Sequence, residues 1–133
     1  MPIVGFNLNK ILIEKKNPVK KDLKVKQNLL IKDIDKSKAD VGSIDLIKFM
    51  FEFQLDYGQV GQVLMTGDVL YTADSKEIKN ILEEWKKNKK LPTELGPQVF
   101  NTILFRCNVK ALNLEQELNL PYHINLPRFK PAK

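Results

Sequence analysis

The hydrophobic pattern is clearest at residues 47–57, where large apolar side chains occupy every second position. A period of two places alternate side chains on one face of an extended strand, so this segment predicts a strand with an apolar face. That face carries Ile47, Phe49, Phe51, Phe53, Leu55 and Tyr57. The opposite face is polar apart from Met50. Such an apolar face forms either the core of a sheet or a surface that binds other apolar chains, and residue types leave both open.

Three further segments predict strands, over about 3–15, 22–34 and 60–72. In the first, Phe6 and Leu8 differ in parity from Ile11 and Ile13, so a bulge near Asn9 is needed to point all four inward. The second strand is apolar on one face and mostly lysine on the other. Its apolar residues are Leu23, Val25, Leu29 and Ile31.

The remaining breaks in the strand region have local explanations. The charged and small residues at 35–44 indicate a loop between the second and third strands. Gly67, inside the last strand, indicates a bulge or the close approach of another backbone.

The period changes to a helical one after residue 73. Asp74 followed by Glu77 fits a helix N-cap, and a helix is predicted over about 75–89. A second helix is predicted over about 97–118, after Gly96-Pro97, with apolar residues at spacings of three and four. The tail at 119–133 contains three prolines, so we expect it to lie extended against the body.

The lysines at the end of the first predicted helix have a simple interpretation. Cations there complement the exposed carbonyl groups, so we interpret them as a solvated cap and not as a binding site. They are Lys86, Lys87, Lys89 and Lys90.

This order of elements predicts one α+β domain over residues 1–133. Successive strands joined without intervening helices favour a four-stranded antiparallel meander over 3–72, with both helices packed on one face and an extended tail. Some apolar side chains fall on the other face, which implies a second covering such as another subunit. They are Leu30, Met50, Leu64 and Leu70.

Length and composition agree with a single folded domain. The chain has 133 residues, of which 43% are hydrophobic and 29% charged. No apolar run approaches the roughly 20 residues of a membrane-spanning helix, and the first residues lack the pattern of a signal peptide. The one cysteine sits in a helical apolar pattern. We therefore expect a cytoplasmic protein with a reduced, buried thiol.

The net charge of +6 is concentrated in the first part of the chain. Residues 1–38 contain ten lysines and four acidic residues, whereas the charges of the remaining residues balance. Lysines on an edge strand discourage unwanted strand pairing, which is a structural explanation. A basic stripe that binds nucleic acid or another polyanion is the alternative, through Lys20, Lys21, Lys24 and Lys26.

The residues that carry chemistry are few. One histidine, His123, and one cysteine, Cys107, cannot supply the roughly four ligands of a zinc site. A nucleophilic pair of these two residues lacks an evident third group. Glu83 and Glu84 lie on a charged helix face, where solvated charge explains them.

No phosphate-binding loop is apparent either. Gly58, Gly61 and Gly67 flank a strand–turn–strand, whereas phosphate loops open a helix. We therefore expect no enzyme activity, no metal and no cofactor.

Three stretches resemble the SecB-like protein-export chaperones, as a divergent, archaeal-type relative. They are NLNKILIEKK (7–16), GQVLMTGDVLYTA (61–73) and VFNTILFRCNVKALNLEQELNLPYHINLPRF (99–129). The resemblance implies a four-stranded antiparallel sheet with helices, assembled as a dimer of dimers. It also implies a chaperone that binds unfolded polypeptides in apolar grooves without ATP, in protein export.

The chain departs from the family in three respects. Family members are acidic, and their sheet surface contacts a translocase motor, whereas this chain is basic. The zinc-binding tail of the family is missing, and segment 74–98 looks longer and more helical. A translocation partner is therefore left open.

Three functional hypotheses follow from the sequence. A peptide-binding chaperone would use apolar residues on partly covered surfaces, although core packing is the simpler explanation for the phenylalanines. The candidates are Phe51, Phe53, Tyr57, Met65, Leu114, Leu118, Leu120 and Tyr122. The alternatives are a nucleic-acid-binding protein and a structural assembly subunit. For the chaperone and the assembly subunit, the surplus of apolar surface predicts a homo-oligomer, a dimer or a tetramer.

Overall fold

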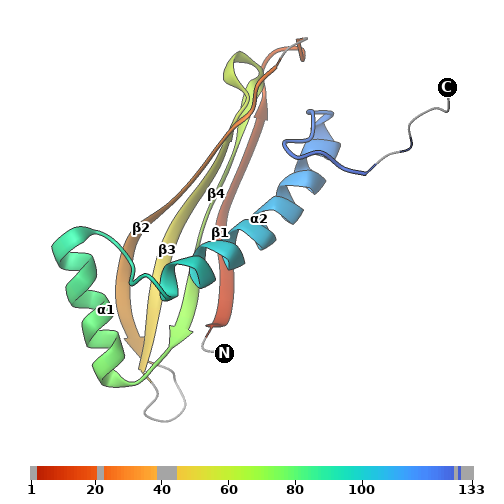
Figure 1. The fold of residues 1–133 in the computed structure, drawn as a ribbon. Coiled ribbons are helices and arrows are strands. Elements are labelled where there is room, and N and C mark those ends of the chain that lie inside the picture. The colour runs from red at the N-terminus through yellow and green to blue at the C-terminus, as the bar shows by residue number, and fades with distance from the viewer. Residues whose placement is uncertain (1–2, 21–22, 39–44, 128, 130–133) are drawn as a thin grey trace.

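The computed structural model describes residues 3–20, 23–38, 45–127 and 129 (Figure 1). The described chain forms strands β1 (Ile3–Lys15), β2 (Lys26–Lys38), β3 (Asp45–Asp56) and β4 (Gly61–Thr72), a short 3-10 turn (Gly58–Val60), and helices α1 (Ser75–Asn88) and α2 (Leu95–Leu118). The predicted α+β class is confirmed, with four antiparallel strands followed by two helices. β2 lies later than expected, so residues 35–38 belong to the strand and not to the loop.

The strands form one antiparallel sheet in the order β1-β4-β3-β2. β2, β3 and β4 follow one another as a meander, whereas β1 pairs with β4 instead of β2. β1 and β2 are therefore the two edge strands. The connection between them passes the 3-10 turn, where the Asn17 side chain donates a hydrogen bond to the Gln59 carbonyl over 2.6 Å.

Register shifts in the two edge strands bring apolar residues of opposite parity onto one face. In β1 the register shifts between Leu8 and Lys10, which places Phe6 and Ile13 on the same side, as the sequence predicted. In β2 a shift between Ile31 and Asp33 turns Ile34 inward, and this bulge was not predicted. The extra residue at 32 breaks the period of two, which explains why the alternation ends early in the sequence.

The core lies between this inner face of the sheet and the two helices. α1 packs on β2 and β3, whereas α2 packs on β4 and β1, and both helices cover the same face (Figure 1). Phe49, Phe51 and Phe53 of β3 are at most 1% exposed. α2 buries Val99, Ile103, Cys107 and Ala111, which follow one another at intervals of four residues.

The first helix is held to the sheet at its beginning. Asp74 accepts a hydrogen bond from the backbone N–H of Glu77 over 2.8 Å, which confirms the predicted N-cap. The Glu77 carboxylate accepts a hydrogen bond from the Tyr71 hydroxyl over 3.0 Å. Burial, together with this hydrogen bond, raises the pKa of Tyr71 to about 12.

Neither α1 nor α2 is long and apolar enough to cross a membrane.

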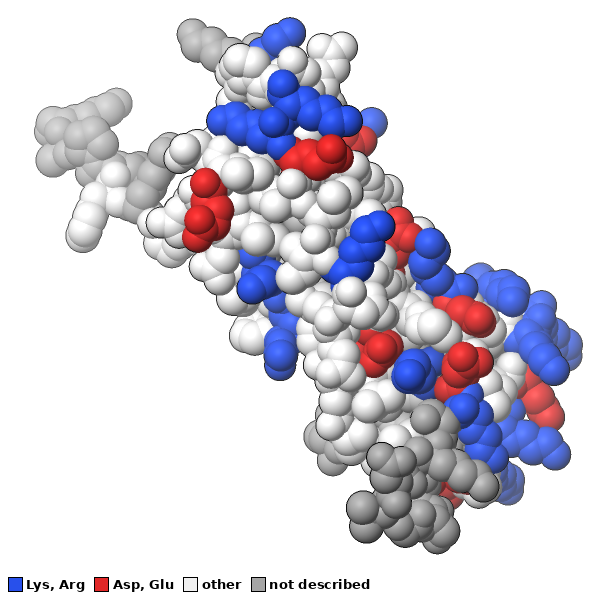
Figure 2. All heavy atoms as spheres, turned by 180° about the vertical axis from the view of Figure 1, so that it is seen from behind, with Lys and Arg blue, Asp and Glu red and all other residues white. Residues whose placement is uncertain are grey.

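The outer face of the sheet is left without a covering by the described chain. Met50, Leu64 and Leu70 are half-buried there, and Leu30 at the edge is 45% exposed. Figure 2 shows this face, with uncharged side chains over much of its centre and lysines gathered on the side of α1. The second covering that the sequence implied is therefore not supplied by the helices.

Gly67 is required where β1 and β4 meet, because a methyl group there would collide with the carbonyl oxygen of Asn7. We expect Gly67→Ala to lower the free energy of unfolding by about 2 kcal/mol or more, measured by urea denaturation. The matched control is Gly5→Ala, whose methyl group would meet only the flexible Leu70 side chain, at 3.2 Å. Equal stability of the two variants would contradict this account of the β1–β4 contact.

Candidate functional site

An open groove runs along β2, because α1 and α2 stand on different strands and leave the space between them unfilled. It consists of two cavities, of about 650 Å³ and about 440 Å³. The first is lined by Ile34 and Lys36 of β2 and by Ile78, Leu82, Trp85 and Lys86 of α1. The second is lined by Leu29, Leu30 and Ile31 of β2 and by Trp85, Leu91 and Phe100. We call the two cavities together the β2 groove.

Trp85 stands between the two cavities and lines both. It is the single tryptophan of the chain and is 7% exposed. Its indole Nε1 is buried and has no hydrogen-bond acceptor among the described residues. A buried donor without a partner costs about 1–3 kcal/mol, so an acceptor that reached it on ligand entry would be favourable.

The walls of the groove combine apolar side chains with a free strand edge. Leu82, Leu91 and Phe100 are half-buried, and Leu30 lies at the border between the second cavity and the outer face of the sheet. β2 is an edge strand, so every second residue directs its backbone N–H and C=O away from β3. An extended chain can pair with such an edge and place alternate side chains in neighbouring pockets.

Lysines form the rim of the groove on the α1 side. Lys79, Lys86 and Lys89 line the first cavity, while Lys89 and Lys90 line the second. The Lys89 ammonium group lies over the Trp85 ring, 5.6 Å from its centroid. The sequence suggested only a solvated helix cap for the last three of these lysines. The structure adds that they border the groove, because α1 turns this side toward β2.

A second cluster of polar side chains is buried at the other end of the molecule, around Glu115. This carboxylate is fully buried on α2 and accepts hydrogen bonds from the Tyr57 hydroxyl and from the backbone N–H of His123. The Nδ1 atom of His123 lies 3.0 Å from both carboxylate oxygens. Its Nε2 atom lies 2.7 Å from Oδ1 of Asn108. The cluster thus joins β3, α2 and the tail.

This cluster is an anchor for the tail and does not have the arrangement of a nucleophilic site. Burial, together with the hydrogen bond to Glu115, raises the pKa of the Tyr57 hydroxyl far above its usual range. Burial raises the pKa of the Cys107 thiol to about 12, so the thiol is neutral near pH 7. His123 has Glu115 and Asn108 as its hydrogen-bond partners. No three His, Cys, Asp or Glu side chains of the described chain are grouped as metal ligands.

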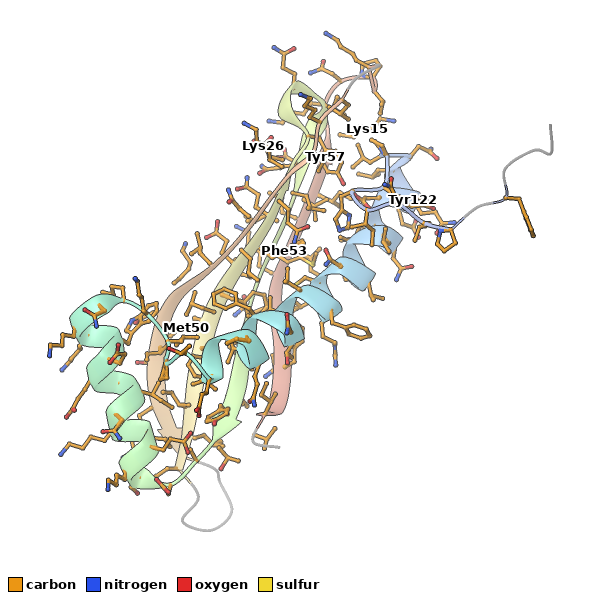
Figure 3. All side chains as sticks on the ribbon, viewed as in Figure 1. Lys15, Lys26, Met50, Phe53, Tyr57 and Tyr122 are labelled. Atoms are coloured by element: carbon orange, nitrogen blue, oxygen red, sulfur yellow. The ribbon has the colours of Figure 1, made fainter. Side chains whose placement is uncertain are left out.

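The residues predicted to bind peptides are mostly part of the core. Phe51, Phe53, Tyr57 and Met65 are at most 1% exposed beneath the helices, and Leu120 is 5% exposed. Leu114 and Leu118 are half-buried on α2. Tyr122 is 45% exposed beyond the end of α2 (Figure 3). The structure does not bring these side chains together on one open surface.

The predicted polyanion-binding lysines lie near the start of β2. Lys20, Lys24 and Lys26 are exposed, with Lys26 at the first position of the strand (Figure 3). Lys21 lies outside the described residues. Tyr57 lines a cavity together with Lys20 and Lys24, but it is fully buried and offers no stacking surface to a base.

The groove and the Glu115 cluster were both missed by the sequence prediction, although weak signals existed. Glu115 continues the row of Cys107 and Ala111 at intervals of four residues, so a charge at that position indicates a buried partner. Leu29 and Ile31, on the apolar face of the second strand, were the available signal for the groove. Which helix would stand beside it could not be read from local pattern.

The buried Glu115 cluster predicts a large effect from a small change. We expect Glu115→Gln to lower the free energy of unfolding by about 3 kcal/mol, because the donors of Tyr57 and His123 lose a charged acceptor in a buried site. The control is Glu117→Gln, two residues away on the exposed side of α2, with an expected change below about 0.5 kcal/mol. Urea denaturation measures both, and a tolerated Glu115→Gln would show that the cluster contributes little.

No family model matches the chain, and a search of curated proteins found no match. Among solved structures, the chain is similar to a SecB-like chaperone of Mycobacterium tuberculosis in complex with a peptide from an antitoxin. The two share 12% sequence identity with a TM-score of 0.49, over 98% of this chain and 91% of the other. At this level the two chains are similar without a shared family being shown.

Proposed function

We propose that this chain binds extended, non-native polypeptide segments in the β2 groove, as a chaperone-like protein that needs no ATP. The observation that carries the proposal is the combination of a mostly apolar cavity, an adjoining cavity of mixed lining that shares Trp85, and a free strand edge beside them. A strand edge recognises any extended backbone, and pockets that accept alternate side chains favour apolar residues. A folded partner would not present its backbone in this way, whereas an unfolded segment does.

The expected strength of binding suits a protein that holds and releases its clients. Burial of apolar surface contributes about 25 cal/mol per Å², so roughly 200 Å² of contact gives about 5 kcal/mol before ordering costs are subtracted. Binding of one segment is then weak and reversible. Several grooves in an oligomer would hold one unfolded chain more tightly through multivalency.

The tail is proposed as a second contact for a bound segment. Tyr122 is exposed directly beside His123, which the Glu115 cluster holds in place. Half-buried Leu114 and Leu118 lie on the preceding turns of α2. The four candidates under the helices are left out of this contact, because a client could reach them only if the helices moved away from the sheet.

The proposal predicts that the purified chain suppresses the aggregation of a chemically denatured model protein without nucleotide. We expect Leu91→Ser to weaken this suppression several-fold, because it removes half-buried apolar surface that lines the second cavity. The control is Val19→Ser, an apolar residue that is 41% exposed outside the groove. Light scattering measures the effect over a range of chain-to-client ratios.

Two results would count against the proposed function. The first is aggregation that stoichiometric amounts of the wild-type chain leave unchanged. The second is an equal loss in the two variants, since this would place the active surface outside the β2 groove. Urea denaturation of both variants checks that folding is not the cause.

We also propose that the chain forms a homo-oligomer through α2. Phe105 and Val109 are 72% and 51% exposed, and with half-buried Leu112 they form a second apolar stripe along the helix. A stripe of this kind is self-complementary when two copies pack about a twofold axis.

This proposal predicts a dimer or tetramer in solution. We expect Phe105→Glu to dissociate it to monomers, because a charge in the centre of an apolar contact has no partner. Lys110→Glu, an exposed position on the same helix but away from this stripe, is the control and should leave the mass unchanged. Analytical ultracentrifugation at micromolar concentration measures the mass of each variant, and a monomeric wild-type chain would rule the oligomer out.

A further inference from the structure

The cationic rim of the β2 groove has few carboxylate partners. Ion pairs of lysines in the described chain join Lys16 to Glu14, Lys32 to Glu52 and Lys36 to Asp45. The four lysines of the rim, on α1 and just after its end, form none of these pairs, and all are exposed. They are Lys79, Lys86, Lys89 and Lys90. Their positive charges are thus available to a ligand in the groove.

The acidic residues near the groove are confined to the first cavity. Asp33 and Asp35 line it from β2, and Glu83 lines it from α1. The Oδ1 atom of Asp33 accepts a hydrogen bond from the backbone N–H of Ile34 over 2.9 Å, and Asp35 lies opposite Lys48 in the strand register. The second cavity is lined by apolar residues, Gly96, Lys89 and Lys90, with no acidic residue. The positive potential is therefore strongest at the second cavity and at its border with the first.

Lys89 occupies that border. It lines both cavities, and its ammonium group is held over the Trp85 ring. Residues 33–36 of β2 line the first cavity, and residues 29–31 line the second. The midpoints of these two stretches are about four to five positions apart, which corresponds to roughly 15 Å along an extended chain. A segment that filled both cavities with apolar side chains would place the residues between them beside Lys89.

We infer that the β2 groove selects acidic segments, namely extended polypeptides with two apolar side chains about four residues apart and carboxylates between or beside them. This inference rests on the proposed function and specifies its ligand class. Carboxylates would pair with Lys89 and Lys90, whereas lysine or arginine at the same places would be repelled. Partly exposed pairs of this kind contribute modestly and are screened by salt, so the preference is one of degree.

The test uses Trp85 as its own reporter, because the chain contains no other tryptophan. Three peptides without tryptophan carry the same two leucines four residues apart, with three intervening residues that are Glu, Gln or Lys. We expect the Glu peptide to bind about tenfold more tightly than the Gln peptide at low salt, the Lys peptide to bind weakest, and the differences to shrink at high salt. Fluorescence titration and calorimetry measure each Kd.

Variants show whether the rim is responsible. The double substitution Lys89→Gln and Lys90→Gln should remove most of the preference for the Glu peptide and leave the Kd of the Gln peptide nearly unchanged. The matched control, Lys76→Gln with Lys110→Gln, removes the same charge from exposed positions outside the groove and should keep the preference. A control pair that lost the preference equally would assign it to net charge and overturn the inference.

The outcomes separate the inference from the proposed function. If all three peptides bind with equal Kd, or the Lys peptide binds best, the acidic preference is wrong and peptide binding stands. If no peptide binds by either method, the proposed function of the groove fails together with the inference.

Discussion

One constraint shapes this molecule: two helices must cover the apolar inner face of a sheet that is longer and wider than they are. Strands of 12 or 13 residues extend about 40 Å, whereas the 14 residues of α1 extend only about 21 Å. α2 packs on β4 and β1, and α1 packs on β2 and β3, so the inner face of the central strands is covered whereas part of β2 is left open. The groove is the remainder of this incomplete covering.

The same constraint explains the distribution of charge along β2 and α1. A strand edge bordered by open apolar cavities is prone to uncontrolled pairing, and lysine is the residue that natural edge strands use against it. Here lysines stand around the cavities without closing them. The same lysines therefore have two effects. Their positive charge disfavours pairing of β2 with the β2 edge of another copy, and it also disfavours the binding of basic peptide segments.

At the other end of the molecule, the buried Glu115 carboxylate holds the tail in place through hydrogen bonds, whereas elsewhere apolar packing holds the segments together. Glu115 interrupts the apolar row of α2, and its burial is tolerable because the Tyr57 hydroxyl, the backbone N–H of His123 and the His123 ring converge on it. Apolar contacts would hold the tail in many similar positions, whereas hydrogen bonds to one carboxylate define one. Tyr122 is thereby fixed in an exposed position although it belongs to a segment without regular structure.

The sequence by itself determined the elements, because strand alternation, helix capping and bulges are local properties of the chain. The period of two in β3, the cap at Asp74 and the bulge near Asn9 could all be predicted, as could the α+β class. Only the tertiary structure decided that β1 pairs with β4 and that Trp85 stands between two cavities. It also decided which of the candidate peptide-binding residues are buried in the core, namely Phe51, Phe53, Tyr57 and Met65. These outcomes depend on which elements pack together across long stretches of chain, and no local pattern encodes the space that such packing leaves open.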